Sequence, residues 1–133
     1  MIVQSQSGAF VSGDGSYLFE VVGESHYQAD LERIVGGRTE DSASFQCVGT
    51  LIPEPDNPYD PQAVCVSVDG CTVAHLSRDW AAKFKDALLS SGYARASCNA
   101  LIVGGWDRGE DDRGHFGIKL DIALPLNFQP VSR

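Results

Sequence analysis

Apolar residues along the chain cluster in short segments separated by glycine, proline and charged residues, a pattern typical of a protein rich in short β-strands. Residues 45–52, 96–103 and 115–124 have the length and apolar content of strands. Residues 9–19 surround a glycine-rich turn, and glycine tolerates the positive φ of tight turns. This segment predicts two short strands that form a hairpin at the start of the domain.

A second hairpin is the clearest local signal in the chain. Residues 63–68 and 72–76 are strand-like, and Asp69-Gly70 between them is a typical hairpin turn. Residues 53–61 precede this hairpin and contain four prolines in nine positions. Because proline fixes φ and cannot donate a backbone hydrogen bond, this segment is expected to be a rigid, exposed loop.

The first predicted helix follows residue 25. Ser25 and Gln28 have the spacing of a capping box, and apolar residues follow at 31, 34 and 35. Gly36-Gly37 would end the helix, because glycine readily adopts the left-handed conformation of a helix C-terminus.

The second predicted helix runs from Arg78 to about Ser91. Ser77 precedes it as a typical N-cap, and Gly92 follows it. Its apolar residues recur at helical spacing and are expected to pack on the core: Trp80, Phe84, Ala87 and Leu88.

Together these elements predict a mainly β fold: an OB-like barrel of about six strands with two inserted α-helices. A length of 133 residues and a hydrophobic content of 43% suit one domain spanning residues 1–133. Residues 125–133 are expected to form a peripheral tail. Because no apolar run approaches the ~20 residues that cross a bilayer, we expect no membrane association and a cytoplasmic location.

Charge and cysteine content narrow the possible functions. The net charge of -8 argues against binding long nucleic acid, which depends on neutralising phosphates with Lys and Arg. Any DNA site is therefore expected to be local. The four cysteines show no Cys-x-x-Cys pair or zinc-ligand spacing, so they are expected to be buried thiols: Cys47, Cys65, Cys71 and Cys98.

Catalytic motifs do not occur in the sequence. It contains no nucleophile elbow, phosphate-binding Gly-Lys-Ser/Thr loop or His-Glu-x-x-His motif, so we expect neither enzymatic activity nor a cofactor or bound metal. One alternative stays open from residue types alone: a metal-dependent hydrolase or nuclease that uses Asp56 and Asp60 beside His75.

Three segments, in this order and spacing, resemble the HIRAN domain family: residues 21–28, residues 53–66 and residues 73–78. The middle segment, with the pattern Pro-x-Asn-Pro-Tyr-Asp-x-x-Ala-Val, is the most specific. The resemblance extends over about residues 17–124 and is to stand-alone bacterial or phage members. It implies a modified OB-type barrel and a non-catalytic role in binding the 3′ end of single-stranded DNA, as in helicase-like transcription factor, or damaged or stalled-fork DNA in repair.

The resemblance also implies a set of DNA-binding residues. A 3′ end offers a hydroxyl, unstacked bases and a phosphate, which require an acceptor, aromatic faces and a cation. Where eukaryotic members place a basic residue and a tyrosine, this chain has Ser25 and His26. The implied residues are Ser25, His26, Asp56, Asn57, Tyr59, Asp60, His75, Arg78 and Phe116.

Each type of residue in this set has an expected role. Asp60 would accept a hydrogen bond from the terminal hydroxyl, and Asn57 would contact a base edge. Tyr59, with His26 or Phe116, would stack on bases, and Arg78 would contact a phosphate.

Two other interpretations of these residues stay open. Asn57 to Asp60 is also a common turn sequence whose side chains bond loop amides. The acidic composition, including Glu110 to Asp112, is also typical of a protein-interaction or adaptor domain that regulates a partner such as a helicase or nuclease.

Overall fold

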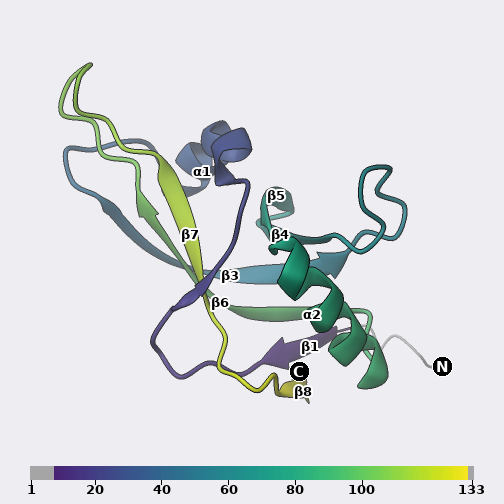
Figure 1. Ribbon diagram of the computed structural model, residues 1–133. Helices are drawn as coiled ribbons and strands as arrows, with labels where there is room; N and C mark the ends of the chain where they lie inside the picture. Colours follow the sequence, from purple (N-terminus) through teal and green to yellow (C-terminus); the bar gives the residue numbers. More distant parts are fainter. Residues whose placement is uncertain (1–7, 132–133) are drawn as a thin grey trace.

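The computed structural model describes residues 8–131, which form a curled, mostly antiparallel β-sheet with two α-helices (Figure 1). The predicted OB-like fold class is confirmed. No helix within these residues is both long and apolar enough to cross a membrane. The elements are β1 (Gly8–Val11), β2 (Phe19–Glu20), a 3₁₀ helix (Glu24–Tyr27), α1 (Gln28–Val35), β3 (Ala43–Pro53), β4 (Val64–Val68), β5 (Cys71–His75), α2 (Arg78–Ser90), β6 (Arg95–Gly104), β7 (Phe116–Asp121) and β8 (Phe128–Pro130).

Six strands form the main sheet in the order β2-β7-β6-β3-β4-β5. The longest antiparallel pair, β3 and β6, forms its centre and is in register from Ala43 opposite Gly104 to Leu51 opposite Ala96. Alternate residues of β6 are buried, as expected for a strand with one face on the core. The predicted hairpin of β4 and β5 is confirmed, with Asp69 and Gly70 at positive φ in its turn.

The two edges of this sheet meet at one point. Val22, just after β2, forms an antiparallel bridge with His75, the last residue of β5. The Val22 amide donates to the His75 carbonyl at 2.8 Å, and the His75 amide donates to the Val22 carbonyl at 2.9 Å. We call this bridge the seam, because it joins the first and last strands of the six-strand order.

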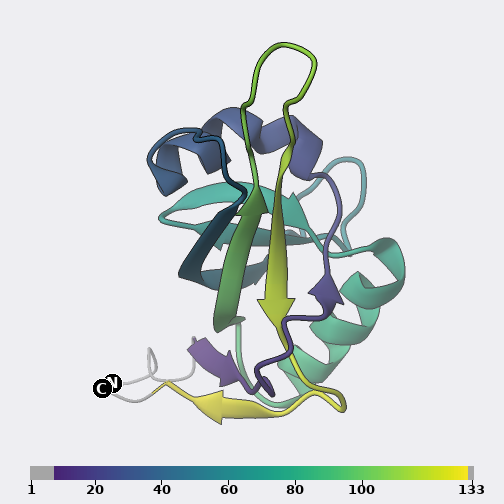
Figure 2. The ribbon, with the colours of Figure 1, turned by 90° about the vertical axis from the view of Figure 1, so that its left-hand side faces the viewer.

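Helix α2 covers one opening of the curled sheet (Figure 2). The Ser77 hydroxyl accepts from the Trp80 amide at 3.3 Å, which confirms the predicted N-cap. Phe84 and Leu88 are fully buried, and the Phe84 ring packs edge-on against Phe128 of β8 at 5.5 Å. Phe84 and Leu88 of the predicted apolar stripe therefore belong to the core, and Trp80 packs against it while partly exposed.

The predicted hairpin at residues 9–19 is wrong. β1 pairs in parallel with β6 and antiparallel with β8, whereas β2 pairs with β7. The connection between β1 and β2 instead turns over the carboxylate of Asp121 on β7, to which the Gly15 amide donates at 2.9 Å.

The prediction of a peripheral tail over residues 125–133 is wrong in part, because β8 pairs with β1 and so belongs to the sheet.

The predicted capping box is also wrong. Ser25 lies within the 3₁₀ helix, and α1 begins only at Gln28 without a side-chain cap. The Gln28 side-chain amide instead bonds both backbone groups of Phe116: it donates to the carbonyl at 2.9 Å and accepts from the amide at 2.7 Å. The predicted stop is confirmed, because Gly36 caps α1 with a φ of 97°.

Burial divides the four cysteines into two pairs. Cys65 and Cys98 are buried, whereas Cys47 and Cys71 are partly exposed, so the prediction of buried thiols holds for two of them. Burial raises the pKa of the Cys98 thiol to about 12, and it also raises the pKa values of Cys65 and Cys47.

Thiol reactivity is expected to follow this burial. At pH 8 the native chain should leave Cys98 and Cys65 unmodified by a thiol-reactive disulfide reagent, because the reactive thiolate is both inaccessible and rare. In denaturant all four cysteines should react. Peptide mapping after a timed exposure measures this, and rapid native-state labelling of Cys98 would contradict the described core.

Candidate functional site

The candidate site is centred on His75, at the seam. His75 Nε2 lies 3.0 Å from Oε1 of Glu54, the residue that follows β3. Both side chains are partly buried, with 27% and 31% of their surfaces exposed. Because strand ends fix both residues, this pair connects the proline-rich loop directly to the seam.

Asn57 organises the proline-rich loop. Its Oδ1 accepts from the amides of Tyr59 at 2.8 Å and Asp60 at 3.1 Å, and its Nδ2 donates to Glu54 Oε1 at 3.2 Å. Short polar side chains commonly stabilise turns in this way. The turn interpretation is therefore confirmed for Asn57, whose amide is used within the loop.

The loop presents Tyr59 outward. Tyr59 is 90% exposed, the highest value among the large hydrophobic residues described. Its backbone is nevertheless fixed by Asn57, so the ring stands on a preformed turn. An exposed aromatic side chain on an ordered loop is available for stacking against an unpaired base.

Asp60 and Arg78 lie beside this turn. Asp60 Oδ1 accepts from the Gln62 amide at 2.9 Å, and its Oδ2 lies 3.9 Å from Arg78 Nε. The Arg78 side chain is 85% exposed and begins α2. The structure thus places a carboxylate oxygen and an accessible guanidinium side by side.

The first predicted segment approaches the site from the other side. Ser25 and His26 are exposed on the 3₁₀ helix, and the adjacent Tyr27 ring lies 6.3 Å from the His75 ring. The seam joins the same segment to His75 through Val22. The three segments on which the predicted resemblance rests therefore meet around His75.

Two predicted residues differ from the rest. Asp56 is exposed on the loop, and no hydrogen bond or ion pair is found for its side chain within residues 8–131. Phe116 is only 2% exposed, and the Arg38 guanidinium lies 4.9 Å from its ring centroid. Because its ring is in the core, Phe116 offers no open face on which a base could stack.

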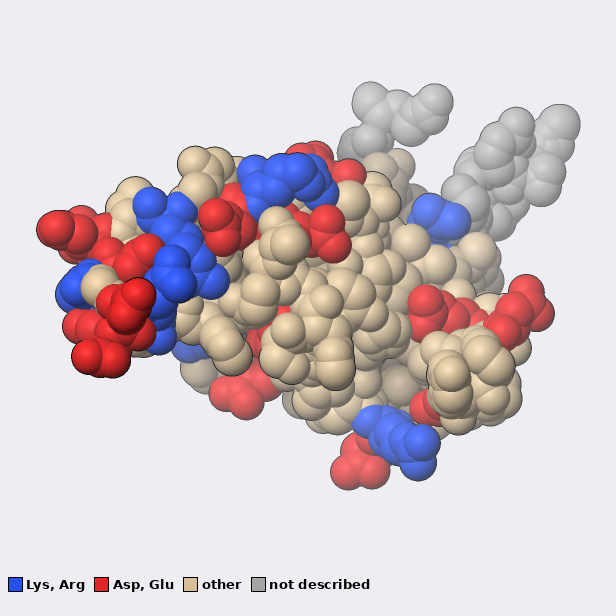
Figure 3. Space-filling view, turned by 90° about the horizontal axis from the view of Figure 1, so that it is seen from above, with Lys and Arg blue, Asp and Glu red and all other residues tan. Residues whose placement is uncertain are grey.

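Charges are mixed rather than segregated on the face that carries α1 and the β6–β7 loop. Seen from above in Figure 3, Lys and Arg side chains alternate with Asp and Glu on the part that carries α1 and the β6–β7 loop. Ion pairs there join Arg38 to Glu32 at 3.1 Å and Arg113 to Asp107 at 2.9 Å. This face therefore lacks the single-sign basic field expected of a binder of long nucleic acid.

Metal binding receives no support from this geometry. Within residues 8–131, no group of three or more His, Cys, Asp and Glu side chains is arranged to hold a metal ion. The His75 imidazole is bonded to Glu54 rather than to Asp56 or Asp60. We therefore do not propose the metal-dependent nuclease.

Sequence reasoning missed two residues of the site. Glu54 accepts from Asn57 and pairs with His75, and Tyr27 packs beside His75. Glu54 lies within the middle segment, two residues after the predicted strand 45–52 and between two prolines, so its position near a strand end was a usable signal. Tyr27 was not recognised as a site residue because it was assigned to the first predicted helix.

Comparison of the chain with protein-family models, with curated proteins and with solved structures finds no match. The function is therefore argued from the geometry of the site and the chemistry of its residues.

Proposed function

We propose that the surface around His75 binds the 3′ end of single-stranded DNA, without catalysis, as a HIRAN-like domain. The observation that carries this proposal is the meeting of the three resembling segments at the seam, with Tyr59 and Arg78 exposed on a rigid frame. Tyr59 would stack on a terminal base, and Arg78 would contact the last phosphate. Asp60 Oδ2 would accept a hydrogen bond from the terminal hydroxyl.

The charge of the site favours an end over continuous DNA. Glu54 and Asp60 place two carboxylates on the same loop, so a long row of phosphates would be repelled. A single DNA end needs only one acceptor for its terminal hydroxyl, the Asp60 carboxylate, and one cation for its last phosphate, the Arg78 guanidinium. Binding is expected to be local, with a shallow dependence on salt because few counterions are released.

Fluorescence anisotropy tests this proposal with short labelled single-stranded oligonucleotides that carry a free or a phosphorylated 3′ end. The free end should bind more tightly, and Tyr59→Ala should weaken binding about 5- to 150-fold, the equivalent of about 1–3 kcal/mol for one stacked base. Asp60→Asn keeps an acceptor for the Gln62 amide but removes the charge, and it should reduce the preference for the free end.

Leu89→Ala is the matched control for Tyr59→Ala. Leu89 is also exposed, but it lies near the far end of α2, about 16 Å along the helix from Arg78. Its replacement should leave the affinity unchanged. Equal binding of both oligonucleotides would contradict end recognition, and no binding even at low salt would contradict DNA binding altogether.

A further inference from the structure

Residues 43–49, seven of the eleven residues of strand β3, have a paired neighbour on only one side. Residues 43–51 pair with β6, but β4 pairs only with residues 50–53. Within residues 8–131, no strand pairs with the other edge of residues 43–49. In Figure 2 this dark blue segment lies at the margin of the sheet. Alternate N–H and C=O groups of an unpaired edge point away from the sheet and can pair with another strand.

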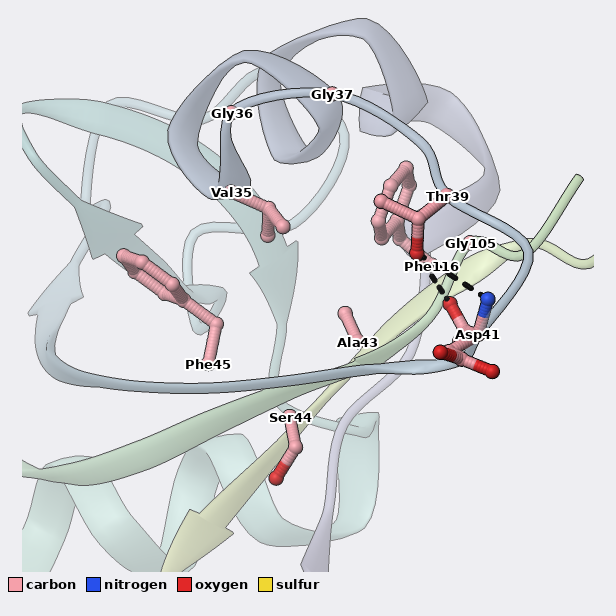
Figure 4. Close-up of a pocket in the computed structure, with 11 residues that line it drawn as sticks. Val35, Gly36, Gly37, Thr39, Asp41, Ala43, Ser44, Phe45, Gly105 and Phe116 are labelled. Atoms are coloured by element: carbon pink, nitrogen blue, oxygen red, sulfur yellow. Dashed lines mark hydrogen bonds between the residues drawn. The ribbon is translucent and has the colours of Figure 1, made fainter.

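A pocket of about 240 Å³ adjoins this edge, between the end of α1 and the start of β3 (Figure 4). Its apolar surface comes from Val35, Ala43, Phe45 and the edge of Phe116. Gly36 and Gly37 form one wall and carry no side chains that would occupy the pocket. Because the pocket adjoins the free edge, an incoming strand could place one side chain in it.

Three carboxylates lie near the edge or the pocket, whereas Arg38, between pocket residues Gly37 and Thr39, is paired with Glu32. Asp41 lines the pocket, and Glu40 precedes Asp41 in the chain. Asp69 lies near Cys47 of β3, where its negative charge, together with burial, raises the pKa of the thiol. Within residues 8–131, none of these three carboxylates forms an ion pair. The C-terminal end of α1, which carries the negative end of the helix dipole, opens on the same pocket.

We propose that the free edge of β3 binds an extended segment of a partner protein, which adds as a strand and places a lysine or arginine side chain at the pocket. Backbone pairing would supply affinity, and the pocket with Asp41 would supply specificity. The aliphatic part of a long basic side chain suits Val35, Phe45 and Ala43, and its charged end suits Asp41. The free edge of β3 and its pocket are separate from the site around His75, so this proposal does not depend on DNA binding.

The proposal can be tested with displayed random 12-residue peptides selected on the whole chain. Selected peptides should be enriched in β-branched residues and in lysine or arginine. The tightest peptide, synthesised with a fluorescent label, should protect from hydrogen exchange the alternate backbone amides of residues 43–48 that point away from β6. Ala43→Leu, which fills the pocket, should weaken its binding at least tenfold, and Asp41→Lys at least fivefold.

Glu110→Lys supplies the control, because it makes the same charge change on the exposed β6–β7 loop and should leave peptide affinity unchanged. Asp41 is exposed, so Asp41→Lys keeps the test valid if Ala43→Leu disturbs folding. Failure to select any binder, protection of other residues, or enrichment of acidic peptides would overturn the proposal. Self-association through residues 43–48 in sedimentation velocity would overturn it in favour of a second copy of this chain.

Discussion

Gly105→Ala is expected to lower the free energy of unfolding by about 2–5 kcal/mol. Gly105 has a φ of 75°, where a side chain costs about 1–2 kcal/mol. A Cβ at this position would also clash with the buried Phe116 ring, and such overpacking typically costs a further 1–3 kcal/mol. The ring cannot move away easily, because Arg38 lies against it and Gln28 holds its backbone.

Gly92→Ala separates the two contributions. Gly92 has a similar φ of 88°, but a Cβ there would meet nothing within 4 Å. Its replacement should therefore cost only the backbone strain, about 1–2 kcal/mol. Urea unfolding of both variants, followed by circular dichroism, measures the difference. Equal losses would show that Phe116 does not restrict residue 105.

Asp121→Ala is expected to cost about 2–3 kcal/mol. Asp121 is 6% exposed, and its two oxygens accept from the Gly15 amide at 2.9 and 3.1 Å. Hydrogen bonds to a charged group typically contribute about 1.5–3 kcal/mol, and truncation to Ala removes both acceptor oxygens. The variant would also detach the connection between β1 and β2 from β7.

Two further variants test this role for Asp121. Asp121→Asn keeps one acceptor oxygen and should retain much of the stability. Asp14→Ala removes a carboxylate from the same connection, but Asp14 is exposed and bonds only the nearby Ser16 amide, so its loss should stay within about 0.5 kcal/mol. Equal losses for Asp14→Ala and Asp121→Ala in urea unfolding would contradict the assigned role.

Elements with strong local signals were predictable from the sequence. The helix after Ser77 has a cap, an apolar stripe and a terminating glycine, and the hairpin around Asp69-Gly70 has a turn of only two residues. In both cases the stabilising interactions lie between residues that are close in sequence. Such signals need no knowledge of the rest of the fold.

The errors arose where distant residues decide local structure. Gln28 matched a capping pattern, but its amide bonds the backbone of Phe116, 88 positions away. The glycine-rich connection after β1 matched a hairpin, but Asp121 holds it from 106 positions away. No pattern within either segment reveals such a partner.

The sequence was sufficient to predict which segments form the candidate site, but not how their side chains are arranged. The structure brings His75, Asn57, Asp60 and Arg78 together, and their roles in binding DNA stay predictions. Phe116 matched by position, but its burial depends on packing across the sheet that a linear pattern does not contain.

The seam gives the domain a natural point of local opening. Within residues 8–131, the bridge between Val22 and His75 is the only backbone pairing that joins the outer edges of the six-strand sheet, whereas β3 and β6 share nine paired positions. Breaking this bridge would separate the edges without disrupting a strand ladder, so exchange of the Val22 and His75 amide protons should report its opening free energy. A ligand that contacts His75 would raise that energy by mass action, which makes ligand binding and closure of the sheet one coupled equilibrium.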